Sequence, residues 1–275
     1  MDTRPSIAGR WYPHRPEHLR RDLAHYFAQA EVQPPAGRVW GVVAPHAGHR
    51  YSGPVAAYAF HCLRGLQPEV VVVVGPSHYP YQPPILTSEY QAYQTPLGAI
   101  EMDRAVLADL DERLQARLGY GLAAVRDDPE HSLEVELPFL QEVLPPFRLA
   151  PLMLRDQSKY AAQALGECLA ETLMGKAAVL VASSDLSHFY PQATALRLDG
   201  EMLRRVAAFD PQAVLAADGV GVGYACGRGA IAAVLWAAGR LGANQVTVLR
   251  HATSGDVTGD YDSVVGYGAA VIWQN

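Results

Sequence analysis

Five consecutive valines at residues 70–74 constrain the fold of this chain more than any other segment. β-Branched side chains favour the extended backbone, and a strand that is apolar at every position must be covered on both faces. A strand of this kind lies at the centre of a sheet that carries helices on either side. The valine run therefore predicts an α/β protein with a buried central strand.

Other apolar runs and helical patterns alternate along the chain. The predicted strands comprise residues 39–44, 70–74, 147–154, 178–182 and 264–273. The predicted helices comprise residues 16–30, 55–64, 158–174, 194–208 and 227–240. This alternation predicts a central, mostly parallel or mixed sheet with helices on both faces. Because no repeat or linker divides the chain, we expect a single domain over residues 1–275.

The composition argues against several classes of protein. Of the 275 residues, 49% are hydrophobic and 18% are charged, which is typical of a globular chain. A formal net charge of -6 gives no electrostatic reason to expect nucleic acid or an anionic membrane as a partner. No segment approaches the roughly 18 consecutive apolar residues of a membrane-spanning helix. The N-terminal residues also lack the apolar core of a secretory signal, so we expect a cytoplasmic protein.

Three of the predicted strands are each followed by a loop that contains a histidine. His46 follows the strand at 39–44, His78 follows the valine run, and His188 follows the strand at 178–182. Ligands of open α/β sheets bind beyond the carboxyl ends of the strands. We therefore expect the three histidines to converge on one pocket. Taken alone, each is more often an ordinary loop residue that bonds a backbone carbonyl.

Asp185 and His188 are three residues apart, so one turn of helix would place both side chains on the same side. An Asp–His pair can bind a metal ion, or the carboxylate can orient the imidazole for proton transfer. The alternative is that Asp185 or a serine before it, Ser183 or Ser184, only caps the following turn.

Cys226 differs in its setting from the other two cysteines. Cys62 and Cys168 lie in helical patterns and are predicted to be small buried residues. Cys226 lies in a glycine-rich loop before an apolar helix, where the helix N-terminus and Arg228 predict a lowered thiol pKa. Such a cysteine is a nucleophile, a redox centre or a metal ligand, and the alternative is a small buried residue in a tight loop.

His131 and Glu134 are also three residues apart, at the start of another predicted helix, and this spacing would place both on one face. They do not form an HExxH zinc motif, because the second histidine is absent. Glu134 or Glu136 can instead simply stabilise the helix N-terminus through its charge. Two strand-end histidines, the Cys226 thiolate and the Asp185–His188 pair together form a borderline-soft set of donors that suits zinc, iron or copper.

The order of these motifs resembles that of the Memo family, whose prokaryotic members are also called AmmeMemoRadiSam system protein B. The matching segments comprise residues 8–13, 44–48, 75–78, 130–134, 183–188, 226–228 and 254–256. They extend over nearly the whole chain. The chain departs from the family pattern at three places. His49 and Arg50 stand where an aromatic or similar residue is common, Tyr79 where a second histidine is common, and Glu136 where histidine or glutamine is common.

The resemblance implies a fold similar to that of the class III extradiol dioxygenases, non-haem iron enzymes that open catechol rings. It implies that His46 and His78 are metal ligands. Cys226 would take the third ligand position, where the dioxygenases have a carboxylate. Because a thiolate softens the site, the implied cofactor is a divalent transition metal, with iron or copper preferred and zinc also compatible.

The resemblance further implies an acid–base role for His188 with Asp185 beside it, and a place for His131 in the same pocket. The predicted function is a metal-dependent redox or dioxygenase-like reaction. One alternative is a binding module that uses the pocket for a phenolic or anionic ligand or for a protein partner. Another is metal-free chemistry, with Cys226 as nucleophile and His188 as base. The expected partners are a small molecule or peptide and the other proteins of its operon.

Overall fold

The computed structural model describes residues 2–275 and has the valine run at the centre of a large sheet. In the order β10-β12-β2-β9-β3-β8-β4-β7, neighbouring strands pair, and β11 pairs with β12. Every residue of β3 is buried. The strands are β2 (Arg38–Ala44), β3 (Val70–Pro76), β4 (Ile85–Ser88), β7 (Ala123–Val125), β8 (Arg148–Leu154), β9 (Ala178–Ser183), β10 (His188–Tyr190), β11 (Gln245–Thr253) and β12 (Val264–Gln274).

The four central strands run parallel, and the flanking strands make the sheet mixed. β2 pairs with β9, β9 with β3, and β3 with β8, all in parallel. β12 joins β2, and β4 joins β8, in antiparallel orientation. The prediction of an α/β protein with a mostly parallel or mixed sheet is therefore confirmed.

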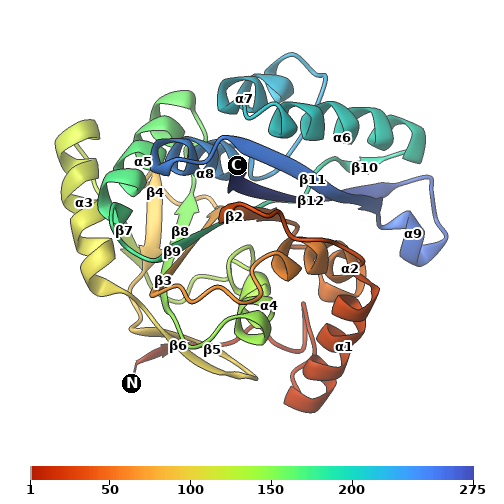
Figure 1. Cartoon of the computed structure of the whole chain (residues 1–275), viewed down its shortest axis with the longest axis horizontal. Helices are drawn as coiled ribbons and strands as arrows, with labels where there is room; N and C mark the ends of the chain where they lie inside the picture. The colour runs from red at the N-terminus through yellow and green to blue at the C-terminus, as the bar shows by residue number, and fades with distance from the viewer. Residues whose placement is uncertain (1) are drawn as a thin grey trace.

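Helices cover both faces of this sheet, as the sequence predicted (Figure 1). One face carries α1 (Pro16–Gln29), α2 (His49–His61) and α4 (Leu137–Val143). The other carries α3 (Arg104–Leu118), α5 (Lys159–Leu173), α6 (Gln192–Ala207), α7 (Pro211–Gly219) and α8 (Arg228–Leu241). A smaller sheet is formed by β1 (Thr3–Arg4), β5 (Ala92–Thr95) and β6 (Gly98–Glu101), and the short helix α9 (Gly255–Thr258) follows β11.

Both predicted bounds of the helix at residues 55–64 were wrong, because α2 extends over His49–His61. The helix expected from residue 55 begins at His49, so Pro54 lies inside α2 rather than before it. The backbone N–H groups of Tyr51 and Ser52 both donate to the carbonyl of Gly48, which closes a first turn ahead of the proline. The helix therefore starts immediately after the loop that carries His46.

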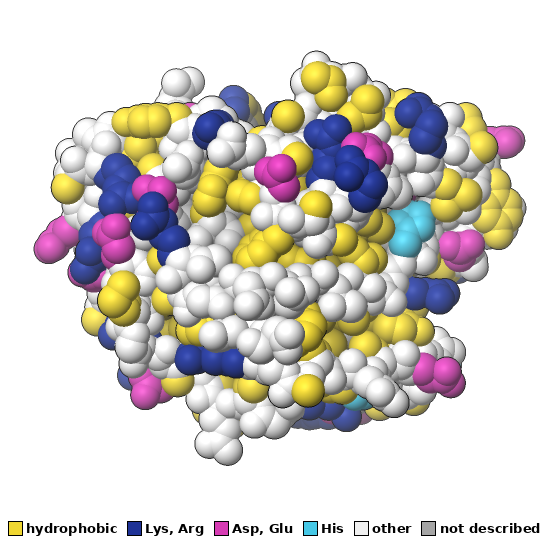
Figure 2. Space-filling view, turned by 45° about the horizontal axis from the view of Figure 1, so that its top comes forward, with side chains coloured by type: hydrophobic (Ala, Val, Ile, Leu, Met, Phe, Trp, Pro, Cys, Tyr) yellow, Lys and Arg dark blue, Asp and Glu magenta, His cyan; other side chains and the backbone are white. Residues whose placement is uncertain are grey.

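The cysteines and the surface also bear on the sequence predictions. Cys62 and Cys168 are buried and free, as expected of small packed residues. Along residues 2–275, no helix combines the length and the apolar character needed to cross a membrane. Figure 2 shows Lys and Arg side chains interspersed with Asp and Glu on the face viewed, rather than gathered in one basic patch.

A buried ion cluster joins the N-terminal strand β1 to the loop before α4. The guanidinium of Arg4 is 2% exposed and lies 3.1 Å from both carboxylate oxygens of Asp128. It also pairs with Glu134 and donates to the carbonyl of Glu130 at 2.6 Å. Since a buried carboxylate without a cation is costly, Arg4 holds this loop in place through its charge.

We predict that Arg4→Met lowers the free energy of unfolding by about 3–5 kcal/mol, because it leaves two buried carboxylates without a counter-charge. Urea denaturation would measure the loss. Arg126→Ala is the matched control, because its pair with Asp2 is 42% and 46% exposed and should contribute only about 0–1 kcal/mol. Equal losses for the two variants would contradict this account of Arg4.

Candidate metal centre

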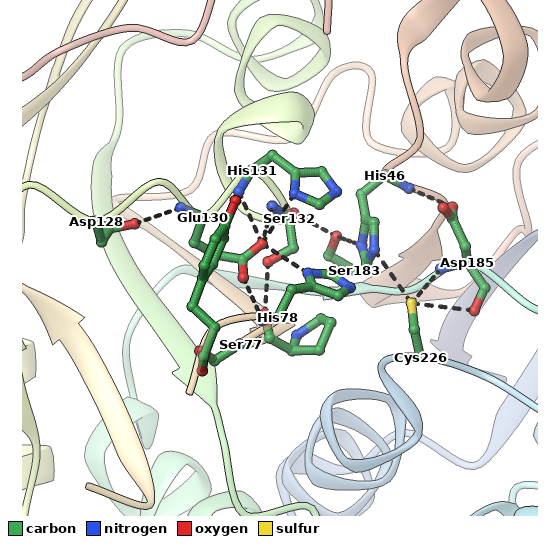
Figure 3. Close-up of polar contacts among 12 residues, drawn as sticks. His46, Ser77, His78, Asp128, Glu130, His131, Ser132, Ser183, Asp185 and Cys226 are labelled. Atoms are coloured by element: carbon green, nitrogen blue, oxygen red, sulfur yellow. Dashed lines mark hydrogen bonds and ion pairs between the residues drawn. The ribbon is translucent and has the colours of Figure 1, made fainter. Parts of the chain in front are cut away.

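The structure brings His46, His78 and Cys226 together at the carboxyl edge of the parallel strands (Figure 3). His46 and His78 each follow a strand by two residues, β2 and β3 respectively, and Cys226 precedes α8. One candidate ligand atom from each residue lies within 4.8 Å of the other two. His46 Nε2 is 3.3 Å from Cys226 Sγ.

The loop that carries Cys226 reaches this edge because a glycine permits close approach to the end of β9. A Cβ atom at Gly227 would lie 2.5 Å from the carbonyl oxygen of Ser183. Gly227 N–H donates to Ser184 Oγ at 2.8 Å, and Asp185 N–H points at Cys226 Sγ at 3.2 Å. Any larger residue at position 227 would push the thiol away from the histidines.

Each of the two histidines has its Nδ1 atom engaged, which leaves its Nε2 atom for a ligand. His46 Nδ1 lies 2.8 Å from Ser183 Oγ, and His78 Nδ1 lies 2.9 Å from Glu130 Oε1. Metal-binding histidines in proteins usually have the remote nitrogen bonded in this way. His46 is buried, whereas the His78 side chain is 33% exposed, so the cluster opens to solvent on the His78 side.

Glu130 organises the His78 side of the cluster, although the sequence analysis assigned it no role. Its carboxylate accepts bonds from the backbone N–H groups of His78, His131 and Ser132 (Figure 3). Burial alone would raise the pKa of Glu130, but these bonds and His78 lower it to about 2. Conversely, burial opposes a charge on His78, but Glu130 raises the pKa of His78.

Glu130, His78 and His131 form a second group close enough to share an ion. Oε1 of Glu130 already accepts from the backbone N–H groups of His131 and Ser132 and lies 2.9 Å from His78 Nδ1, and Oε2 accepts from the backbone N–H of His78. The carboxylate therefore orients the two imidazoles and has little capacity left for a ligand role.

His131 lies against the cluster and is held from behind by an aromatic ring. Its ring stacks on Trp11 at 3.7 Å between centroids, and lies 4.9 Å from the ring of His78 and 5.4 Å from that of His46. Burial lowers the pKa of His131 to about 4 despite the nearby Glu130. His131 is therefore a neutral wall of the pocket.

Glu134 does not share a face with His131, so that expectation was wrong. Residues 131–133 are not helical, and Glu134 begins a short 3₁₀ helix, Glu134–Glu136. Its carboxylate turns towards Arg4, Ser6 and Tyr12 instead.

The predicted pairing of Asp185 with His188 was also wrong. In the part of the chain that the structure describes, Asp185 Oδ1 accepts from the backbone N–H of His46 at 2.9 Å and of Ala47 at 3.2 Å. The loop between β9 and β10 is not helical, so the two side chains diverge. Burial raises the pKa of Asp185 to about 7, against the effect of these two bonds. Asp185 thus fixes the loop of His46.

His188 borders the cluster with one nitrogen free. Its Nδ1 lies 2.8 Å from the carbonyl of Leu186, so Nδ1 carries the proton and Nε2 is the atom that can accept one. Burial lowers the pKa of His188, and a charge on its ring lowers that of His46. His188 is therefore close enough to affect the cluster without touching Asp185.

The lowered thiol pKa predicted for Cys226 was wrong for the protein without a bound cation. Burial is the largest effect and, with Asp185, raises the pKa of the Cys226 thiol. Arg228 is 3.3 Å from Asp218, so its charge is already paired. The imidazole nearest to the thiol belongs to His46, and not to His188 as the metal-free mechanism requires.

An aromatic cleft of about 550 Å³ adjoins the cluster, and the sequence analysis did not identify it. Trp11, which backs His131, and Ala47, which follows His46, belong to its walls. The remaining lining residues include Arg10, Gly48, Tyr51, Phe189, Ser254 and Tyr267. A planar molecule in the cleft would lie next to Trp11 and Ala47, on the side of the cluster formed by His131 and His46.

The donor atoms fit a transition metal. In a tetrahedral site, a nitrogen ligand and a sulfur ligand are about 3.5 Å apart, close to the separation of His46 Nε2 and Cys226 Sγ. Three protein ligands leave one position open, as in catalytic rather than structural sites. No cation among residues 2–275 stabilises the charged form of the buried thiol, and a metal ion would provide one.

Comparisons with known proteins agree with the motif order. The model of the protein family described as Memo-like protein matches residues 3–271 of this chain. The chain is 37% identical over 279 residues to a MEMO1 family protein of Methanothermobacter thermautotrophicus, covering 97% of this chain and 99% of the relative. It is 34% identical over 290 residues to one of Thermotoga maritima, covering 99% of this chain and 100% of the relative.

A solved structure supports the fold. The crystal structure of an uncharacterized protein from Escherichia coli K12 superposes with a TM-score of 0.55 over 85% of this chain and 100% of that one, at 14% identity. Similarity at this level concerns the fold alone. The family match over almost the whole chain and the full-length relatives show that this chain belongs to the Memo-like protein family.

Proposed function

We propose that this protein binds one divalent transition metal through His46, His78 and Cys226, and that it uses the metal in redox or dioxygenase-like chemistry. The observation that carries the proposal is the convergence of two imidazoles and a thiol from three loops, with Nδ1 of both imidazoles already engaged. Two nitrogens and one sulfur form a borderline-soft set, which favours iron or copper and also admits zinc. When bound, the metal would supply Lewis acidity or electron transfer.

The surrounding residues would move a proton and position a substrate. His188 is proposed as the acid–base group, because Nε2 is free and the neutral ring can accept a proton. His131 would exclude water from one side of the pocket, and Asp185 would hold the loop of His46. The three free cysteines fit a reducing compartment, so we place the protein in the cytoplasm.

A second candidate function is non-catalytic binding in the same pocket. The aromatic cleft favours it, because stacked rings and Arg10 suit a phenolic or anionic group on a small molecule or peptide. Binding of that kind would not require turnover.

We predict that purified protein loaded with zinc carries about one ion per chain, and that His46→Ala and Cys226→Ser weaken binding by more than 100-fold. The expectation follows because even groups that only orient ligands contribute about 10–100-fold. Elemental analysis and competition with a chelating dye would measure it. His25→Ala on the exposed side of α1 is the matched control. Protein that refuses iron, copper and zinc alike would remove the proposal.

The affinity for metal should rise with pH. The raised pKa of Cys226 keeps the thiol protonated near neutrality, so a metal must displace that proton, and affinity should rise about tenfold per pH unit. His46 does not compete, because burial keeps its pKa well below the usual value. His78, whose pKa is raised, adds a second proton on the acidic side and steepens the dependence there.

Calorimetry in buffers of different ionisation enthalpy would count the released protons. Metal binding to Cys226→Ser should no longer release the proton seen near neutrality. Its affinity should still depend on pH in the acidic range, because His78 is unchanged. A proton count that is unchanged in Cys226→Ser would argue against a thiolate ligand.

If the pocket is catalytic, iron-loaded protein should consume oxygen with a catechol, and His188→Gln should slow turnover by about 10²–10⁴-fold with unchanged metal content. An oxygen electrode and elemental analysis would measure both. Catechol binding without oxygen consumption by any metal-loaded form would favour the binding module instead.

A further inference from the structure

Among the residues that the structure describes, one buried carboxyl group, that of Glu136 beside Ser183, has no charged partner. The segment before α4 carries three buried glutamates, Glu130, Glu134 and Glu136. Glu130 faces His78 and three backbone amides, and Glu134 faces Arg4. Within residues 2–275, the only hydrogen-bond partner of the Glu136 carboxyl group is a hydroxyl. Its Oε1 lies 2.8 Å from Ser183 Oγ, and its Oε2 has no hydrogen-bond partner.

Ser183 Oγ is the meeting point of three contacts. It lies 2.6 Å from the carbonyl oxygen of Ser132, 2.8 Å from Glu136 Oε1 and 2.8 Å from His46 Nδ1. A hydroxyl has one proton to donate and two lone pairs that accept. All three contacts are hydrogen bonds only if one partner receives the proton and the other two donate.

The donors and acceptors at Ser183 follow from this restriction. The Ser132 carbonyl can only accept, so it receives the hydroxyl proton of Ser183. His46 must then donate from Nδ1, and Glu136 must donate from a protonated carboxyl group. An ionised Glu136 would either face a lone pair of Ser183 at 2.8 Å, or accept the hydroxyl proton of Ser183 in place of the Ser132 carbonyl. Each case leaves one short contact without a hydrogen.

We propose that Glu136 is a neutral carboxylic acid that donates to Ser183 and thereby positions His46 for its ligand. It is a positioning residue, and its effect on metal binding rests on the function proposed above. With the proton on Nδ1, the lone pair of His46 Nε2 faces Cys226 Sγ at 3.3 Å. Because a neutral Glu136 donates to Ser183 and does not compete for its hydroxyl proton, that proton stays directed at the Ser132 carbonyl. His46 therefore keeps the tautomer in which it can bind a metal.

The surroundings of Glu136 agree with a neutral group. Burial is the largest influence on its pKa and raises it well above the usual value, and Asp185 acts in the same direction. Ser183 is the last residue of β9 and is paired with Ala44 of β2, so its hydroxyl is held by the backbone of two central strands. The relay therefore has little freedom to rearrange.

Infrared spectroscopy of the full-length, metal-free protein tests the protonation state directly. The difference spectrum of wild type minus Glu136→Gln should contain the carbonyl stretch of a protonated carboxyl group throughout pH 6–8. Glu142→Gln, which removes an exposed glutamate, should instead give only carboxylate bands. Carboxylate bands for Glu136 at neutral pH would overturn the proposal.

Affinity for cobalt(II) tests the positioning role. Glu136→Gln keeps a donor towards Ser183, so its affinity should stay within about threefold of wild type. Glu136→Leu and Ser183→Ala remove the relay and should each weaken binding by about 10–100-fold. A loss in Glu136→Gln as large as in Glu136→Leu would overturn the proposal, because it would show that the carboxylate acts as an acceptor.

The test separates this proposal from that of the metal site. Nitrogen NMR of His46 in metal-free protein should report the proton on Nδ1 in wild type and Glu136→Gln, and a mixture of tautomers in Ser183→Ala. Thermal unfolding of each variant identifies losses due to misfolding. If neither the wild type nor any variant binds metal, the metal proposal fails. The infrared and NMR results still decide whether the Glu136 carboxyl group is protonated.

Discussion

Parallel pairing of β2, β9 and β3 is the constraint on which the rest of this structure depends. The register places Ala44 opposite Ser183, and Val74 opposite Ala182, so the three strands end at nearly the same level. Their following loops must then leave the sheet side by side. Polar residues that are far apart in the sequence meet at this edge because backbone hydrogen bonds align the strands, and not because of any attraction between the residues themselves.

Once the loops meet, the need to satisfy buried polar groups determines their details. Glu130 bonds the amides of His78, His131 and Ser132, and Asp185 bonds those of His46 and Ala47. Each carboxylate thereby fixes the loop of a histidine that follows a neighbouring strand. Because an unsatisfied buried amide or carboxylate is costly, these bonds restrict each loop to one conformation.

The fold was more accessible to sequence analysis than the arrangement of the side chains. The valine run and the helices α1, α5, α6 and α8 have strong periodicity, so their positions were predicted to within two residues, whereas α2 begins six residues earlier than predicted. Helix α3 and edge strand β11 were not predicted, because α3 buries only a narrow stripe and β11 is mostly half-exposed. His46, His78 and Cys226 were identified from strand ends and motif order. The partners of Asp185 and Glu134 depend on contacts across more than 100 residues, which local spacing cannot reveal.

The Cys226 thiol illustrates why local electrostatics can mislead. A helix N-terminus and an arginine nearby predict a thiolate, but both effects are weak beside the removal of the sulfur from water. Here Arg228 is paired with Asp218, and the thiol is buried beside Asp185 and the neutral ring of His46. Within residues 2–275 the protein thus supplies donors of the right geometry but no cation beside the sulfur to stabilise a thiolate. A metal ion bound between these donors would supply the positive charge that stabilises the thiolate.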